Sequence, residues 1–270
     1  MPINYKPIHT SGKRKSITDR LVGSRFRVIN EEFYTTPSYK MEAKLLKDPQ
    51  LFLIYHEGYQ EQRKRWNLNP VDVFLAITAN MYQDVPEAKA MLKRVLNRAK
   101  PLRDIKLATA TRLKTVSRIG DMGCGDATFA RELEGLPIMV RNFDLVSTND
   151  RVEACNILKT PLTDGELDVG LYCLSLMGVD HLQFLKEAFR VIRVGGELWI
   201  AEVASRVTPA FTQLVTQLGF ELIQKLEFSH FICFTFRRLQ EPNAGKRGGR
   251  EAQPAASLEG GLRPCLYKRR

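Results

Sequence analysis

The chain has 270 residues, of which 44% are hydrophobic and 26% are charged, and its formal net charge is +11. This composition is typical of one substantial globular domain with extensions, and no apolar run approaches the roughly 20 residues that a membrane helix needs. We therefore expect no association with a membrane. The first residues lack the apolar core of a signal peptide, which favours an intracellular protein.

The positive charge is concentrated outside the expected folded core. Residues 1–27, 81–118 and 237–270 together carry a net charge of +19, whereas the rest of the chain carries −8. Lysine and arginine displace counterions from phosphates, so this separation favours a nucleic-acid partner. The alternative is that the basic ends only keep the protein soluble.

The five cysteines form no CxxC pair and no His/Cys spacing suited to zinc. The sequence therefore predicts reduced thiols and no metal site.

The amino-terminal half is expected to be helical. Residues 1–23 are polar and basic and are predicted to be a disordered tail, and residues 24–82 are predicted to form a helical cap. Within this cap, Asp48-Pro49 begins one helix, and Asn69 and Pro70 form the N-cap and first position of another. Residues 83–117 are rich in Lys and Arg, and we interpret them as a basic helical insertion.

From residue 118 the pattern changes to short apolar strands that alternate with helices. Seven strands over residues 118–238 predict an α/β core with a doubly wound, Rossmann-like sheet. A helix that begins near Asp180 is expected to end at Gly195-Gly196, and the last two strands are expected to form an antiparallel hairpin at the sheet edge. Residues 239–270 lack core-forming side chains and are predicted to be a disordered basic tail.

A glycine turn follows the first of these strands, in the stretch "GDMGCGD". Gly123 and Gly125 allow a ligand to approach the backbone closely. Asp121 and Asp126 flank them, and their charge would repel the pyrophosphate of a dinucleotide. The turn therefore suits S-adenosylmethionine, which has a sulfonium, an ammonium and no phosphate.

Asp144 ends the second strand, 21 residues after Gly123. This spacing is close to that expected for an acid that accepts from ribose hydroxyls. A plain tight turn at "GCGD" and a helix-capping role for Asp144 are the alternatives. The combination of strand, glycine turn and acid at the next strand end favours a nucleoside cofactor.

These motifs resemble those of the ribosomal RNA-processing protein 8 (nucleomethylin) family. The matching stretches are "SRFRVINEEFYTT", "YHEGYQEQ", "NPVDVF", "GCGD", "FDL", "CLSLMG" and "AEVASR", and the resemblance covers about residues 24–238. It implies a class I, S-adenosylmethionine-dependent methyltransferase of the nucleus and nucleolus. The resemblance further implies methylation of N1 of an adenine in large-subunit ribosomal RNA during ribosome biogenesis, with pre-ribosomal or nucleolar proteins as possible partners.

The resemblance also implies which residues contact the cofactor. His56 would cover it as part of a lid, and Gly123, Asp144 and Cys173 would line its site. Asn156 and Ile157 stand where the family usually has Asp and Met, so we expect binding to survive with a changed affinity. Together with the turn, the predicted cofactor residues are His56, Asp121, Gly123, Gly125, Asp144, Asn156, Ile157 and Cys173.

No catalytic residue stands out, because the sulfonium already activates the methyl group and adenine N1 has a free lone pair. Met177 and Gly178, after the fourth strand, and Asp72, in "NPVD", are the candidate substrate-side residues. Two alternatives stay open: a methyltransferase for another RNA or a small molecule, and a non-enzymatic, cofactor-sensing chromatin or ribosome-assembly factor.

Overall fold

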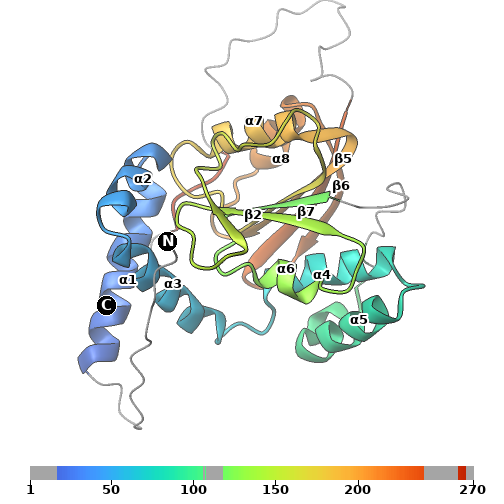
Figure 1. The fold of residues 1–270 in the computed structure, drawn as a ribbon, viewed down its shortest axis with the longest axis horizontal. Coiled ribbons are helices and arrows are strands. Elements are labelled where there is room, and N and C mark those ends of the chain that lie inside the picture. The colour runs from blue at the N-terminus through green and yellow to red at the C-terminus, as the bar shows by residue number, and fades with distance from the viewer. Residues whose placement is uncertain (1–16, 106, 108–117, 240–260, 266–270) are drawn as a thin grey trace, which may run out of the picture.

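The computed structural model describes residues 17–105, 107, 118–239 and 261–265 (Figure 1). The predictions for residues 1–16 and for most of 106–117 and 240–270 lie outside these ranges. The helices are α1 (Ile17–Thr35), α2 (Ser38–Lys47), α3 (Gln50–Arg63), α4 (Pro70–Met81), α5 (Pro86–Arg98), η1 (Lys100–Leu102), α6 (Thr128–Glu132), α7 (His181–Val191) and α8 (Phe211–Gln217). The strands are β1 (Arg118–Met122), β2 (Met139–Asp144), β3 (Val152–Ala154), β4 (Leu167–Cys173), β5 (Ile192–Val203), β6 (Phe220–Glu227) and β7 (Phe231–Arg238).

The described strands form a single sheet in the order β3-β2-β1-β4-β5-β7-β6. The first five strands in the chain pair with one another in parallel, whereas β7 is antiparallel to both β5 and β6. This arrangement confirms the predicted doubly wound, Rossmann-like sheet and the antiparallel hairpin at its edge. The strand order reverses between β1 and β4, and in such sheets the crevice beside this point binds ligands.

Helices cover both faces of the sheet. Helices α4, α5 and α6 pack on one face, and α7 and α8 pack on the other (Figure 1). Phe74 of α4 stacks on Trp199 of β5 with 5.6 Å between the ring centroids. Strand β4 is buried on both faces, which explains its nearly continuous apolar sequence.

Helices α1, α2 and α3 form a separate layer beside the end of the sheet where β1, β2 and β4 finish (Figure 1). Their own apolar cluster contains Ile29, Phe33, Met41, Leu45 and Phe52. Helix α4 begins with Asn69 as N-cap and Pro70 as its first residue, as predicted. Although the predicted division groups α4 with the helical cap, α4 packs on the sheet.

The helix after Asp180 ends earlier than predicted. Helix α7 stops at Val191, and Ile192 already belongs to β5, where it pairs with Leu167. Gly195 and Gly196 therefore lie inside a strand. Ile192 explains the difference. Its β-branched side chain is completely buried in the core, and its backbone pairs with β4.

The structure also corrects the predicted extent of both tails. Helix α1 begins at Ile17, so residues 17–23 are helical. Near the other end of the chain, Leu262 is buried and forms a β-bridge with Val207. Helix α1 adds a further contact, because the Asn30 amide donates to the Cys265 carbonyl at 3.0 Å. Residues 261–265 therefore return to the folded core, a long-range contact that composition does not reveal.

Arg206 anchors this returning segment. Its side chain donates to the carbonyls of Arg263 and Leu176, each at 2.8 Å, and forms a buried ion pair with Glu202. The same guanidinium lies 4.3 Å from the centre of the Tyr34 ring in α1. One buried cation thus connects the sheet, α1 and the carboxyl-terminal segment.

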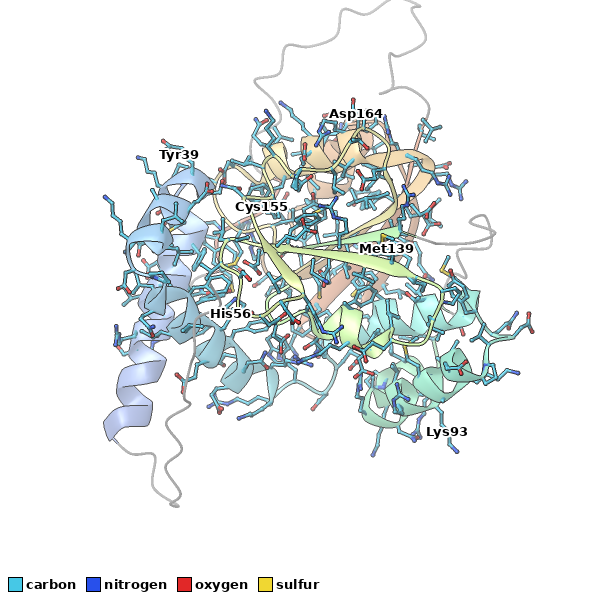
Figure 2. The ribbon with its side chains drawn as sticks, in the orientation of Figure 1. Tyr39, His56, Lys93, Met139, Cys155 and Asp164 are labelled. Atoms are coloured by element: carbon cyan, nitrogen blue, oxygen red, sulfur yellow. The ribbon has the colours of Figure 1, made fainter. Side chains whose placement is uncertain are left out.

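The described part of the basic segment is helical, as predicted. Helix α5 buries Ala88, Met91 and Val95 against α4, and its Lys and Arg residues are exposed. In Figure 2, Lys93 points away from the body of the protein. Among the described residues, none of the helices is apolar over a length that would cross a bilayer.

Candidate cofactor-binding site

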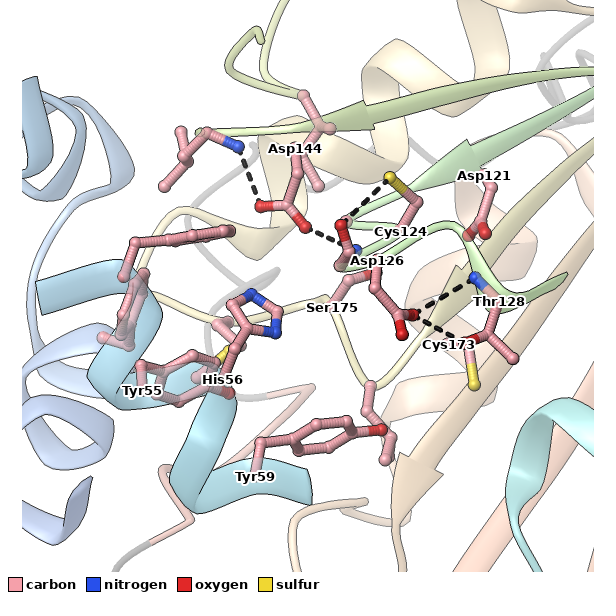
Figure 3. Close-up of a pocket in the computed structure, with 18 of the residues that line it drawn as sticks. Tyr55, His56, Tyr59, Asp121, Cys124, Asp126, Thr128, Asp144, Cys173 and Ser175 are labelled. Carbon is pink, nitrogen blue, oxygen red and sulfur yellow. Dashed lines mark hydrogen bonds between the residues drawn. The ribbon is translucent and has the colours of Figure 1, made fainter. Parts of the chain in front are cut away.

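A pocket lies between α3 and the carboxyl ends of β1, β2 and β4 (Figure 3). All eight predicted cofactor residues line it, although they come from distant parts of the chain. They are His56, Asp121, Gly123, Gly125, Asp144, Asn156, Ile157 and Cys173. The fold therefore brings the predicted set together, while the role of each residue in binding stays a prediction.

The glycine turn leaves no room for side chains. Gly123 has a φ of +79°, and a Cβ there would lie 2.4 Å from the Cβ of Ser175. Gly125 has a φ of +60°, and its Cβ would lie 3.1 Å from Cε1 of His56. The positive φ favours glycine at both positions, and at Gly123 the contact with Ser175 also excludes a larger residue.

Asp144 is held by the turn that it faces. Its Oδ2 accepts from the Gly125 N–H and its Oδ1 from the Leu145 N–H, both at 2.8 Å. Each oxygen keeps a lone pair that could accept from a hydroxyl. Burial raises the pKa of this carboxyl, an effect that His56 and the two backbone hydrogen bonds oppose. The two backbone hydrogen bonds thus fix the orientation of the Asp144 carboxylate in the pocket.

Asp121 makes the pocket more acidic. It is 4% exposed, and burial raises its pKa to about 8, with further contributions from Asp144 and Asp126. A cation bound nearby would favour the ionised carboxyl and lower this pKa. Three acids around one turn therefore suit a positively charged ligand, as predicted from the sequence.

His56 reaches the glycine turn from α3. In Figures 2 and 3 its ring lies between the α1–α3 layer and the sheet, beside the turn. Burial lowers the pKa of His56, although Asp144 and Asp126 oppose the shift. Its position agrees with the predicted cover over the cofactor.

Asn156 contacts helix α2 as well as the pocket. Its amide nitrogen donates to Glu42 Oε2 at 3.0 Å and to Ser38 Oγ at 3.3 Å. Its oxygen accepts from the Leu158 N–H at 3.1 Å. One lone pair of that oxygen remains for a further hydrogen bond. Ile157, beside it, is 8% exposed and lines the pocket.

The predicted substrate-side residues do not all reach the pocket. Met177 lines it and accepts from the Tyr55 hydroxyl at 3.3 Å. Gly178 and Asp72 are not among the lining residues. Buried Asp72 instead accepts from Arg98, which also pairs with Glu132. This ion pair joins α4, α5 and α6, which explains an acid at this position without a contact to substrate.

Cys173 lines the pocket, but its thiol is a poor nucleophile. Burial raises the pKa of Cys173 well above its usual value, so the thiol stays protonated. This environment suits a side chain that lines the pocket and takes no part in covalent chemistry. No described group of three or more His, Cys, Asp or Glu residues could hold a metal ion.

Several lining residues were not predicted as cofactor contacts. Besides the predicted His56, helix α3 contributes further residues at helical spacing, namely Phe52, Tyr55, Tyr59, Gln60 and Arg63. Ser175, in "CLSLMG", also lines the pocket, and its buried Oγ has no hydrogen-bond partner among the described residues. The spacing along α3 was visible in the sequence, whereas the direction that this helix face takes was not.

Comparisons with known proteins agree with this geometry. Residues 12–270 match the protein family described as "Hypothetical methyltransferase". The chain is 38% identical to mouse "Ribosomal RNA-processing protein 8" over 262 residues, and 34% identical to the Dictyostelium discoideum protein of that name over 273 residues. It is 35% identical over 263 residues to "25S rRNA (adenine(645)-N(1))-methyltransferase" of Schizosaccharomyces pombe.

These matches cover nearly all of this chain but only part of the relatives. The aligned regions include 95%, 98% and 95% of the chain, and 48%, 62% and 72% of the mouse, Dictyostelium and yeast proteins. The chain therefore spans about half the length of the mouse relative.

Proposed function

The chain belongs to the ribosomal RNA-processing protein 8 family of methyltransferases, and on this premise we propose that it methylates RNA with S-adenosylmethionine. The substrate that we propose is N1 of an adenine in large-subunit ribosomal RNA. The observation that carries the proposal is the acid-lined pocket at the strand ends, in which Asp144 is bonded to the glycine turn.

The residues present fit this cofactor. Asp144 would hold the ribose hydroxyls, and Asp121 would face the ammonium of the amino-acid end. Ile157 and Leu145 offer apolar surface to the adenine. The buried Oγ of Ser175, which has no hydrogen-bond partner among the described residues, offers a hydrogen bond within the same pocket. When bound, the cofactor supplies a methyl group that its sulfonium activates.

The protein's own part in the reaction is alignment and exclusion of water. Adenine N1 has a free lone pair, so no side chain has to remove a proton before attack. Holding nucleophile and methyl group in line can lower the barrier by several kcal/mol. Tyr55 and Tyr59 of α3 line the pocket and provide aromatic surface for a flipped-out base.

Nucleic acid as partner is supported by the basic composition and by the names of the relatives. The net charge of +11 favours polyanion binding over a small neutral substrate. The Schizosaccharomyces pombe relative is named for adenine-N1 methylation of 25S rRNA. We therefore place the protein in ribosome biogenesis, with large-subunit rRNA and pre-ribosomal proteins as partners and the nucleolus as its location.

The test is methyl transfer from labelled S-adenosylmethionine to unmodified large-subunit rRNA, followed by mapping of the label. We expect N1-methyladenine at one position, and RNA binding that weakens steeply as salt is raised. Label on another base or another RNA would contradict the adenine-N1 assignment. Cofactor binding without transfer to any RNA would instead favour a cofactor-sensing assembly factor.

A further inference from the structure

Arg63 differs from the rest of the pocket in its charge. Among the described lining residues, it is the one Lys or Arg, whereas Asp121, Asp126 and Asp144 supply three carboxyls. In a pocket that binds only a cation, a guanidinium among the lining residues would repel the ligand. The amino-acid end of S-adenosylmethionine, however, carries a carboxylate as well as an ammonium.

Helix α3 directs Arg63 into the pocket. His56, Tyr59 and Arg63 are separated by three and four residues, so they share one helix face. His56 covers the turn beside Asp144, where the ribose would lie. Arg63 lies about 10 Å farther along the helix axis, toward the start of α4. The stripe therefore spans a distance comparable to that between the ribose and the carboxylate of the cofactor.

Asn69 holds the guanidinium in place and leaves part of it available. With its amide oxygen turned toward Arg63, and away from the Val71 N–H that it caps in the other amide orientation, Asn69 accepts from Nε at 2.6 Å and from Nη2 at 3.0 Å. A guanidinium has five N–H donors, so Nη1 and the second hydrogen of Nη2 remain for another acceptor. Such a fixed pair of donors matches the two oxygens of a carboxylate.

Asp121 and Arg63 both lie near the carboxyl end of β4, where Cys173 is the last residue. Burial raises the pKa of the Cys173 thiol, and Asp121 adds to the shift while Arg63 opposes it, so both act on this one side chain. An acid and a base that line the same pocket near the β4 end form a complementary site for a zwitterion. A carboxylate placed there without Arg63 would face acids alone.

We propose that Arg63 binds the carboxylate of the amino-acid end of S-adenosylmethionine, opposite the ammonium that faces Asp121. This inference rests on the proposed cofactor and adds a residue that fixes the methionine end of it. The alternative is that Arg63 contacts a phosphate of the RNA, and the experiment separates the two.

The experiment measures by calorimetry the binding of two small ligands, and in a separate titration the binding of unmodified large-subunit rRNA. S-adenosylhomocysteine has the amino-acid end, whereas 5′-methylthioadenosine has the same nucleoside without it. Arg63→Met is expected to weaken S-adenosylhomocysteine binding roughly 10- to 100-fold, and to change 5′-methylthioadenosine binding less than twofold. Arg63→Lys should lose less affinity for S-adenosylhomocysteine, because the lysine ammonium replaces the paired N–H donors of the guanidinium and keeps the positive charge. Lys64→Met, at the exposed neighbouring position, should leave both affinities unchanged.

Three outcomes would overturn the inference. Unchanged binding of both ligands by Arg63→Met would exclude a carboxylate contact. Equal loss for both ligands would show that Arg63 only shapes the pocket through Asn69. Loss of RNA affinity alone would assign the guanidinium to a phosphate. Failure of the unaltered protein to bind S-adenosylhomocysteine would instead contradict the proposed function itself.

Discussion

The amide nitrogen of Asn156 lies 3.0 Å from Oε2 of Glu42, and this hydrogen bond joins the loop after β3 to helix α2. The same amide contacts Ser38, whose hydroxyl donates to Asp180 at 2.6 Å. Asn156 therefore links the cofactor pocket to the helical layer and to the start of α7. An aspartate, the usual residue of the family at this position, would face the Glu42 carboxylate.

Asn156→Asp should therefore lower the stability of the protein, because the new carboxylate would face that of Glu42 where a hydrogen bond now lies. We expect a loss of about 1–3 kcal/mol in stability and a lower affinity for S-adenosylhomocysteine. Glu42→Gln in the same chain should restore most of both, because the amide can donate to the new carboxylate. Urea unfolding and calorimetry of the double-mutant cycle measure the coupling. Independent, additive effects would contradict it.

Asp144→Ala should remove the acceptor for the ribose hydroxyls and for two backbone N–H groups. The expected loss in affinity for S-adenosylhomocysteine is about 1–3 kcal/mol. Because 5′-methylthioadenosine contains the same ribose, its affinity should fall by a similar factor, unlike the result expected for Arg63→Met. Unchanged affinities in calorimetry would place the ribose elsewhere.

The raised pKa of Asp121 should make the stability of the folded protein depend on pH. Its pKa is raised by burial from 3.8 to about 8 in the folded chain, so the folded state binds a proton that the unfolded state has lost. Stability due to this group is complete below about pH 4 and is lost as pH rises through about 8. Asp121→Asn removes the ionisation, so its melting temperature relative to the unaltered protein should increase with pH.

We expect this relative increase to be several degrees between pH 5.5 and 8.5 in cofactor-free protein. Differential scanning calorimetry at the two pH values is the measurement. A constant difference at both pH values would show that Asp121 ionises normally. At pH 8.5 the variant should also bind S-adenosylhomocysteine more weakly, since the ammonium loses its carboxylate.

Gly123→Ala should both strain the turn and fill the pocket. The positive φ and the contact with Ser175 predict a loss of more than about 1 kcal/mol in stability, and weaker cofactor binding. Gly23→Ala is the matched control, because a Cβ at this helical position meets no side chain of the described residues within 4 Å. It should stabilise α1 by up to about 1 kcal/mol. Thermal unfolding that ranks the two variants alike would contradict this assignment.

Arg206→Met should be strongly destabilising. Glu202, completely buried, would lose its partner, and residues 261–265 would lose their anchor. Breaking such a buried pair typically costs about 3–5 kcal/mol. Replacing Glu202 as well, by Met, should recover part of the loss because no unpaired charge would remain. Denaturant unfolding of both variants tests this, and equal stabilities of single and double variants would refute it.

Much of the fold follows from local patterns in the chain. The strands and helices after residue 118 are predicted by their apolar periodicity, and Asn69-Pro70 predicts the start of α4. The helix end at Val191 was misplaced, because Gly195-Gly196 suggested a stop, whereas the pairing of Ile192 with Leu167 decides it. Local sequence patterns do not reveal that a residue will pair with a distant strand.

Local sequence predicts the strand–turn–helix unit, its two glycines and the acids that flank it, because φ preferences and side-chain period are properties of short stretches. The packing of the folded chain brings Arg63 into the same pocket as these acids, pairs Asp72 with Arg98, and returns residues 261–265 to Arg206. Those contacts join residues that are far apart along the chain. Which side chains meet depends on how whole helices and the sheet pack, and no local preference contains that information.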